Sequence, residues 1–401
     1  MDVAPSIPQK RSLAPVHYTP EDGSPDAEPK IGTALCLSGG GYRAMLFHLG
    51  ALWRLNEAAY LPKLERVSSV SGGSITAGVL ALAWPRLAFD ARGIAQGFQE
   101  QLVRPLRRLA GQTIDVWAAL PNLFLPGTAG PRVIDAYRRH LFGNATLQDL
   151  PDESRGAPSF VINAANLQSG VLWRFSRQYM ADYRVGKINH PTLPVATAVA
   201  ASSAAPPFLS PLILDFDPPD YEPRSGADLQ NPPFTTHVFL TDGGVYDNLG
   251  LESAWKNYRT VLVSDGGGRM QEQPAVARNL LQQMVRVFAV DDNQVRALRK
   301  RQVVGSYLLD EHSPDHRAGA YWGAYSNIED YDLADALPCP VAKTTRLAKV
   351  GTRLARFAPV LQEQLINWGY AVCDAALRKH VITDGSLARP ADFPYPRAGV
   401  G

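Results

Sequence analysis

The hydrophobic pattern in the first part of the chain alternates between short apolar runs and longer apolar helices. Residues 31–37 (IGTALCL) and 66–70 (RVSSV) have the length of strands, and glycines follow each run closely. Residues 42–60 and 74–84 then have the length and hydrophobicity of buried helices. Two successive strand–turn–helix units with such strands are typical of a parallel sheet covered on both faces. We therefore expect an α/β domain with a central, mostly parallel sheet and helices on either side.

Later segments predict further elements of the same domain. Strands are expected at residues 160–166, 172–176, 237–240 and 261–263. Helices are expected at 195–205 and 275–302, loop at 215–233 and 305–342, and two closing helices within 344–381. Residues 1–30, which are rich in Pro, Asp and Glu, are expected to be a flexible lead-in, and residues 382–401 a tail. This leaves 31–381 as one domain.

Composition then excludes several classes of function. The chain has 401 residues, of which 45% are hydrophobic and 19% charged, and a formal net charge of +2, so nothing points to nucleic acid as a partner. Its three cysteines lie far apart and form no C-x-x-C pair. No apolar run reaches the length of a membrane span, and the N-terminus has no apolar signal region. We expect a cytoplasmic protein, at most peripheral at a membrane.

Three predicted strands end in glycine-rich turns, and in a parallel sheet such turns gather at the carboxyl edge. The first turn, Gly39, Gly40 and Gly41, precedes a helix, so its backbone N–H groups can form a cradle for an oxyanion or a phosphate. Glycine allows a substrate to approach the backbone closely because it has no Cβ. Arg43, two residues later, would add positive charge.

The second and third turns supply a nucleophile and a carboxylate. Ser71 falls at the corner between strand and helix, as in the nucleophile elbow G-x-S-x-G. The string at 69–73 is SVSGG, with serine in place of the first glycine. Asp242 ends a predicted strand and is followed by two glycines. A carboxylate that reaches the serine hydroxyl can accept its proton during attack on an acyl carbon.

The three motifs, SGGGYR at 38–43, SVSGG at 69–73 and DGG at 242–244, together resemble the patatin-like phospholipase family. The resemblance extends over about residues 31–268. It implies a three-layer α/β/α sandwich that carries a Ser–Asp dyad, with Ser71 as nucleophile and Asp242 as its base. It also implies that the oxyanion donors are the amides of Gly39, Gly40 and Gly41. Residues after about 269 match no motif and are assigned to helices that pack on the sheet.

Other serines and carboxylates are weighed as alternatives. Ser68 and Ser69 fall inside the predicted strand, and Ser74 fits the first turn of the helix. Asp247 fits a cap for the next helix. Asp265, in the SDGGG turn, also ends a strand; we favour a structural role for it and keep it as the alternative base.

The histidines form no catalytic or metal-binding pattern. His48 lies within the first buried helix, where a packed core role is expected, and His312 and His316 lie in a polar stretch. There is no H-E-x-x-H string or comparable group of ligands, so neither a metal nor a cofactor is expected.

Two features bear on contact with a lipid surface. The basic clusters at 104–108 and 296–301 fit solvated helix faces, with attraction to anionic headgroups as the alternative. The apolar loop Trp117–Leu125 fits either core packing or a lid that touches a membrane.

The function expected from these residues is hydrolysis of acyl esters of lipids through an acyl-Ser71 intermediate. The alternative is a non-catalytic lipid- or nucleotide-binding protein on the same scaffold, because residues 39–44 also fit the string G-x-G-x-x-A. A dinucleotide site requires an acidic residue at the end of the second strand, and that position is the Ser71 turn.

Overall fold

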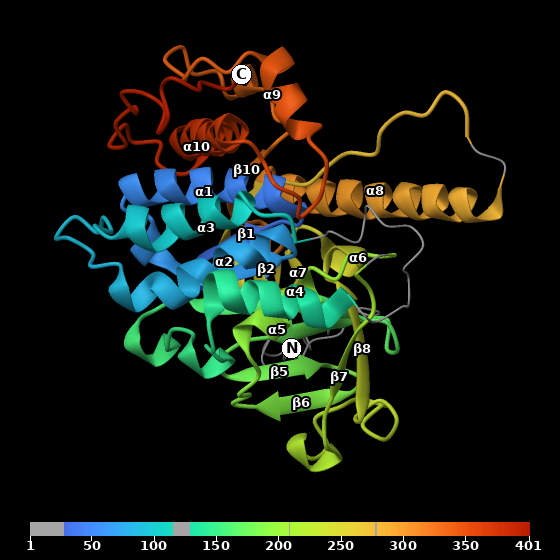
Figure 1. Ribbon diagram of the computed structural model, residues 1–401. Helices are drawn as coiled ribbons and strands as arrows, with labels where there is room; N and C mark the ends of the chain where they lie inside the picture. The colour runs from blue at the N-terminus through green and yellow to red at the C-terminus, as the bar shows by residue number, and fades with distance from the viewer. Residues whose placement is uncertain (1–27, 115–128, 208, 277–278) are drawn as a thin grey trace, which may run out of the picture.

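Five parallel strands form the half of the sheet that positions the site (Figure 1). The computed structural model describes residues 28–114, 129–207, 209–276 and 279–401. The parallel strands, in their order across the sheet, are β10 (Ala318–Gly323), β9 (Tyr258–Asp265), β1 (Lys30–Leu37), β2 (Leu64–Val70) and β3 (Ser159–Asn166). Turns that follow β1, β2 and β9 therefore meet at one edge. The expectation that the strand before Asp242 is a third parallel strand was wrong, because that strand pairs antiparallel with β3.

The sheet continues beyond β3 with antiparallel pairs. These strands are β4 (Leu172–Phe175), β5 (Tyr179–Asp182), β6 (Gly186–Asn189), β7 (Leu212–Asp215) and β8 (His237–Asp242). β8 runs antiparallel to β3, with Asp242 opposite Ala164, while Asn163 lies opposite Val70 of β2. Because of this register, the carboxyl end of β8 lies level with the turn after β2 although the two strands run in opposite directions.

Helices cover both faces of the sheet. They are α1 (Gly41–Glu57), α2 (Gly72–Ala83), α3 (Arg104–Ala110), α4 (Ala129–Tyr137), α5 (Val195–Ser202), α6 (Gly244–Asp247), α7 (Glu252–Trp255), α8 (Leu280–Tyr307), α9 (Val341–Ala348) and α10 (Pro359–His380). Leu35 and Leu37 of β1 face the larger core, which includes residues of α1, α2 and α10. Ala34 and Cys36 face a smaller core with residues of α7 and α8. This is the expected three-layer arrangement around a central, mostly parallel sheet.

Helices α1 and α10 lie against each other at very short distance. A Cβ placed on Gly369 would lie 1.9 Å from the carbonyl oxygen of Phe47, and one on Gly50 would lie 1.9 Å from that of Ile366. The two helices can therefore contact each other backbone to backbone only because both positions are glycine. This contact joins the glycine-rich turn at the start of α1 to the last helix of the chain.

The C-terminal region differs from the prediction in one respect. Residues 305–342 were expected to be loop, but they contain the end of α8 and the edge strand β10, which pairs in parallel with β9. The run AGAYWG is rich in small residues and gives no strand pattern by itself. It is stabilised by pairing with β9 and by the burial of Ala320 and Trp322.

Some expectations concern surfaces or segments outside the sheet. The expected flexible lead-in lies almost wholly outside the described residues, as does the apolar loop Trp117–Leu125. Several side chains of the basic clusters are paired, Arg107 with Glu363 at 2.7 Å and Arg299 with Glu252 at 3.0 Å, which agrees with the structural interpretation of these helices. Among the described residues, no helix combines the length and the hydrophobicity needed to cross a membrane.

Candidate active site

Ser71 occupies a sharp corner between β2 and α2. Its backbone has φ 52° and ψ −120°, a conformation that residues other than glycine rarely adopt. The glycine that follows permits this corner, because a Cβ on Gly72 would lie 2.2 Å from the carbonyl oxygen of Gly41. The turn thus presses the start of α2 against the start of α1. It leaves Ser71 at the wall of a cavity, 7% exposed.

The other serines of this region are hydrogen-bonded inside the core. The Ser68 hydroxyl donates to the carbonyl of Gly250 at 2.6 Å, and the Ser69 hydroxyl to that of Val161 at 3.3 Å. The Ser74 hydroxyl donates to the Ser69 oxygen at 3.0 Å. All three side chains are fully buried, and none lines the cavity. Their structural interpretation agrees with these contacts.

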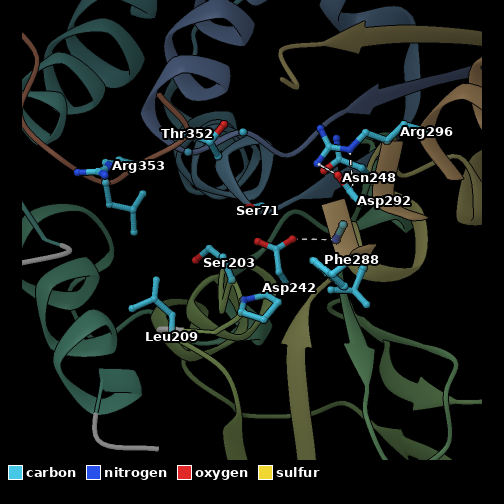
Figure 2. A pocket seen from close by; sticks show the side chains of 17 residues that line it. Ser71, Ser203, Leu209, Asp242, Asn248, Phe288, Asp292, Arg296, Thr352 and Arg353 are labelled. Carbon is cyan, nitrogen blue, oxygen red and sulfur yellow. Dashed lines mark hydrogen bonds and ion pairs between the residues drawn. The ribbon is translucent and has the colours of Figure 1, made fainter. Parts of the chain in front are cut away.

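Asp242 and Ser71 line the same cavity, and the Asp242 carboxylate is directed toward Ser71 (Figure 2). Burial raises the pKa of Asp242 from its ordinary 3.8 to about 6. Three smaller effects lower that pKa: an interaction with the Ser71 hydroxyl, a 2.7 Å hydrogen bond from the Gly244 N–H to Oδ1, and the charge of Arg296. At neutral pH the carboxylate is mostly ionised and is able to accept a proton.

Residues 202–204, at the end of α5, hold both turns in place. The Ser71 N–H donates to Ser202 Oγ at 2.9 Å, and the Ser202 hydroxyl donates to the carbonyl of Asn163 at 2.6 Å. The Asp242 N–H donates to the carbonyl of Ala204 at 3.0 Å. One short segment therefore fixes the spacing between the serine and the aspartate. Ser202 was not predicted from the sequence, because its small-residue helix (VATAVAASSAA) resembles ordinary core packing.

The glycine-rich turn offers two of the three expected amides to the cavity. Gly40, with φ 145°, and Gly41, with φ 57°, both line it. In the described part of the chain, no partner accepts a hydrogen bond from the N–H of either residue. Gly39 differs from the expectation, because its N–H donates to the carbonyl of Asn248 at 3.0 Å and the residue does not line the cavity.

Arg43 lies behind the glycine-rich turn and does not line the cavity. Its side chain is buried, and its guanidinium donates to the carbonyls of Gly266, at 3.1 Å, and Val350, and to the Thr352 hydroxyl at 3.1 Å. Burial lowers the pKa of Arg43 to about 10, which still leaves it protonated at neutral pH. The expected positive charge is therefore present, and its contacts join the glycine-rich turn to the turn after β9 and to the loop after α9.

The cavity has a volume of about 380 Å³, and part of its wall comes from the region of the chain after the last of the three motifs. Helix α8 contributes Phe288, Asp292 and Arg296 to its lining, and the loop after α9 contributes Thr352, Arg353 and Leu354. No part of the cavity was predicted from the sequence of these two segments. Their contribution depends on where α8 and the loop lie in the folded chain, and no local pattern indicates that.

Two of these residues form a charged pair that acts on Asp242. Arg296 donates to the carboxylate of Asp292 through Nε at 3.1 Å, and its Nη2 lies 2.9 Å from Oδ2. Its Nη1 donates to the carbonyl of Gly268 at 3.1 Å. The positive charge of Arg296 lowers the pKa of Asp242, and the negative charge of Asp292 raises it.

The alternative base residues have structural partners. Asp247 accepts hydrogen bonds from the N–H groups of Leu249, at 3.2 Å, and Glu252, at 2.8 Å, and so caps α7 as expected. Asp265 accepts from the Tyr321 hydroxyl at 2.7 Å and from the Gly267 N–H at 2.9 Å. Neither lines the cavity, and neither does His48, which is packed in the core.

Comparison with known proteins adds a family match to this geometry. The family model described as patatin-like phospholipase matches residues 35–255. A "patatin-like phospholipase domain-containing protein" of Coccidioides immitis is 26% identical over 197 residues, which are 47% of this chain and 23% of the relative. This chain therefore spans about a quarter of the length of that relative.

Solved structures with a similar fold include human GIVD cytosolic phospholipase A2, with a TM-score of 0.52 and 12% identity over 85% of this chain and 58% of the other. The same human enzyme in complex with methyl gamma-linolenyl fluorophosphonate and terbium chloride gives a TM-score of 0.50 and 13% identity, over 86% of this chain and 57% of the other. At sequence identities this low, the similarity to these two structures shows a shared fold and nothing more. The family model covers more than half of the chain, and on that match the chain belongs to the patatin-like phospholipase family.

Proposed function

We propose that this protein hydrolyses carboxylic esters of lipids through an acyl-Ser71 intermediate. The observation that carries the proposal is the presence, in the lining of one cavity, of Ser71, Asp242 and the two glycines Gly40 and Gly41, whose N–H groups have no acceptor among the described residues. These are the nucleophile, base and oxyanion donors that acyl transfer requires. Membership of the patatin-like phospholipase family supports a lipid substrate.

The acylation step follows from these positions. Ser71 Oγ attacks the ester carbon while Asp242 accepts the hydroxyl proton. The N–H groups of Gly40 and Gly41 stabilise the oxyanion, an effect worth about 3 kcal/mol per donor in hydrolases of this type. When the tetrahedral intermediate collapses, the alcohol leaves with the proton held by Asp242, and the acyl group stays on Ser71.

Deacylation reverses the roles. Asp242, ionised again, takes a proton from water as the water oxygen attacks the acyl carbon. The second tetrahedral intermediate collapses, the proton returns from Asp242 to Ser71 Oγ, and the acid is released. Both half-reactions need an ionised Asp242, and its pKa of about 6 meets this need at neutral pH.

A fluorophosphonate probe tests the nucleophile directly. The human structural relative was solved with such an inhibitor, so the chemistry suits this fold. We expect intact-protein mass spectrometry to find one adduct on the wild type, mapped to Ser71, none on folded Ser71→Ala, and strongly slowed labelling of Asp242→Asn. Hydrolysis of p-nitrophenyl butyrate should also be slower in both variants than in the wild type, by at least about 10³-fold for Ser71→Ala.

Two outcomes would contradict the proposal. An adduct that persists on Ser71→Ala would place the nucleophile elsewhere. A folded wild type that neither reacts nor turns over ester, with or without lipid vesicles, would favour the non-catalytic binding protein on the same scaffold.

A further inference from the structure

The amino-terminal half of α8 exposes a run of large apolar side chains. Their exposed fractions are 75% for Leu280, 60% for Met284, 53% for Val285, 59% for Val287, 45% for Phe288 and 41% for Val290. At 3.6 residues per turn Leu280, Met284, Val287 and Phe288 share one side of the helix, within an arc of about 100°. Val285 and Val290 lie on the two flanks of this side, and Gln282 and Arg286 lie opposite to it. We call this side the α8 apolar face.

Helix α8 is anchored at its other end. Its carboxyl-terminal half buries Val303 in the smaller core, and the Tyr307 hydroxyl donates to the carbonyl of Val261 at 2.7 Å. The amino-terminal half extends away from the body of the protein (Figure 1). An apolar surface of this kind, left in water on a structure that is firmly held elsewhere, indicates an interaction site.

The α8 apolar face begins at the mouth of the cavity. Phe288 belongs to the face and also lines the cavity, one turn before Asp292 (Figure 2). Exposed apolar residues continue along the cavity wall, with Val245 of α6 and with Ala205 and Pro206 after α5. The apolar surface therefore lies on more than one side of the opening that leads to Ser71.

We propose that the α8 apolar face is the surface by which this protein docks on a lipid bilayer. This inference rests on the proposed function, because it concerns how a lipid ester reaches Ser71. A lipid that moves from the bilayer into the cavity must cross any water between them with its acyl chains exposed. An apolar surface inserted beside the mouth removes that barrier, because the chains then pass from one apolar environment to another.

The charges near the face fit a membrane surface. Between Leu280 and Val290 the only charged residue is Arg286, on the opposite side of the helix. Arg353, exposed, lines the cavity from the loop after α9. Both are cations, which headgroup phosphates attract. The exposed Asp291, which follows Val290, is the carboxylate at which the apolar run ends. A second copy of this chain seated on the same face would cover the cavity mouth, so a bilayer that also supplies the substrate fits this position better.

The test compares two double variants on vesicles. Leu280→Glu with Val287→Glu changes the α8 apolar face at residues that do not line the cavity. Val341→Glu with Val360→Glu makes the same chemical change at other exposed sites, on α9 and at the start of α10, with exposed fractions of 51% and 56%. The measurements are flotation with phosphatidylcholine vesicles, with and without phosphatidylglycerol, turnover of p-nitrophenyl butyrate, and light scattering after size exclusion.

We expect the wild type and the control variant (Val341→Glu with Val360→Glu) to float with vesicles. The α8 variant (Leu280→Glu with Val287→Glu) should bind vesicles at least about tenfold more weakly than the wild type. Turnover of the soluble ester should be the same in all three proteins. Ser71→Ala should float normally and lose turnover, so docking and catalysis can fail separately.

Four results would overturn the inference. One is binding of the α8 variant equal to that of the wild type. Another is a wild type that does not bind either vesicle. The third is a wild-type dimer that the α8 variant converts to a monomer, and the fourth is an α8 variant that loses thermal stability without losing vesicle binding; in these two cases the face is covered by a second copy or by another part of the same chain.

Discussion

Asp242 is a buried carboxylate whose pKa is raised from 3.8 to about 6, so its ionised form is less stable in the folded protein than in the unfolded chain. The proposed chemistry nevertheless requires that form. A shift of about two units corresponds to about 3 kcal/mol of lost folding free energy once the pH exceeds the folded pKa. The folded protein binds this proton more tightly, so its stability falls as the pH rises from about 4 to 6 and then stays level.

Asp242→Asn should therefore stabilise the protein in a pH-dependent way. The neutral amide keeps an oxygen that can accept from the Gly244 N–H, and it removes the cost of ionisation. We expect the free energy of unfolding to increase by up to about 3 kcal/mol at pH 8, with little change at pH 4. Denaturant titrations at the two pH values measure this, and a variant less stable than the wild type at pH 8 would contradict the explanation.

Ser202 affects the proposed chemistry without lining the cavity. Ser202→Ala removes the acceptor of the Ser71 N–H and the donor to Asn163, which we expect to cost about 1–3 kcal/mol of stability. Because the Ser71 corner then loses its support, kcat for p-nitrophenyl butyrate should fall about tenfold or more, with KM little changed.

A matched control for this prediction is Ser176→Ala. Ser176 is also buried and donates to the carbonyl of Tyr179 at 2.7 Å, in the turn between β4 and β5. It should lose similar stability and keep kcat. Equal losses of kcat in both variants would show that Ser202 has no specific positioning role.

At the residue scale, the sequence was most informative where one local feature determines the geometry. Ser71 and Asp242 could be selected because each follows a strand and precedes glycine. Ser202, by contrast, acts through a contact between α5 and the turn after β2, and nothing in its own neighbourhood of small residues marks it. The bonded amide of Gly39 also depends on a distant partner, Asn248.

At the scale of elements, α8 places a carboxylate and a guanidinium beside Asp242. Asp292→Asn leaves Arg296 without its partner's negative charge, so the pKa of Asp242 should fall and the acidic limb of kcat/KM should move to lower pH. Arg296→Gln removes a positive charge, so the pKa of Asp242 should rise and the acidic limb of kcat/KM should move to higher pH. We expect shifts of roughly a few tenths of a unit, because both side chains are partly solvated. Profiles from pH 4.5 to 8 for the three proteins measure them; shifts in the same direction would contradict this account.

The elements predicted from the sequence were those with strong patterns of their own. The strand β1 contains a continuous apolar run, β2 is followed at once by glycines, and α1 and α10 are long. The short strands β5, β6 and β7 and the edge strand β10 were missed because pairing with a neighbour, and not their composition, makes them strands. The antiparallel direction of β8 also depends on pairing with β3, which no local signal encodes.

At the scale of the whole molecule, the contact between α1 and α10 connects the two ends of the domain. Gly369→Ala should force the helices apart, because the new Cβ would lie 1.9 Å from the carbonyl oxygen of Phe47. We expect a loss of about 1–3 kcal/mol or more in the free energy of unfolding. Turnover should fall as well, because α1 carries Gly41 at its first position.

Gly305→Ala provides the comparison, since nothing lies within 4 Å of a Cβ at that position of α8. It should leave turnover unchanged and raise stability by about 0.5–1 kcal/mol, as alanine in a helix usually does. Thermal denaturation and ester turnover of the two variants decide between the expectations, and a Gly369→Ala protein as stable as the wild type would refute the close contact.

The close contact of α1 with α10 also has a consequence for the order of synthesis. A ribosome produces the Ser71 turn before α10, and α8 and the loop at 352–354 come between them. A growing chain thus carries its nucleophile long before it has the cavity wall or the helix against which α1 packs. On the proposed function, a chain that stops before α10 has no assembled site and attacks no lipid, so activity begins only after α10 has been synthesised.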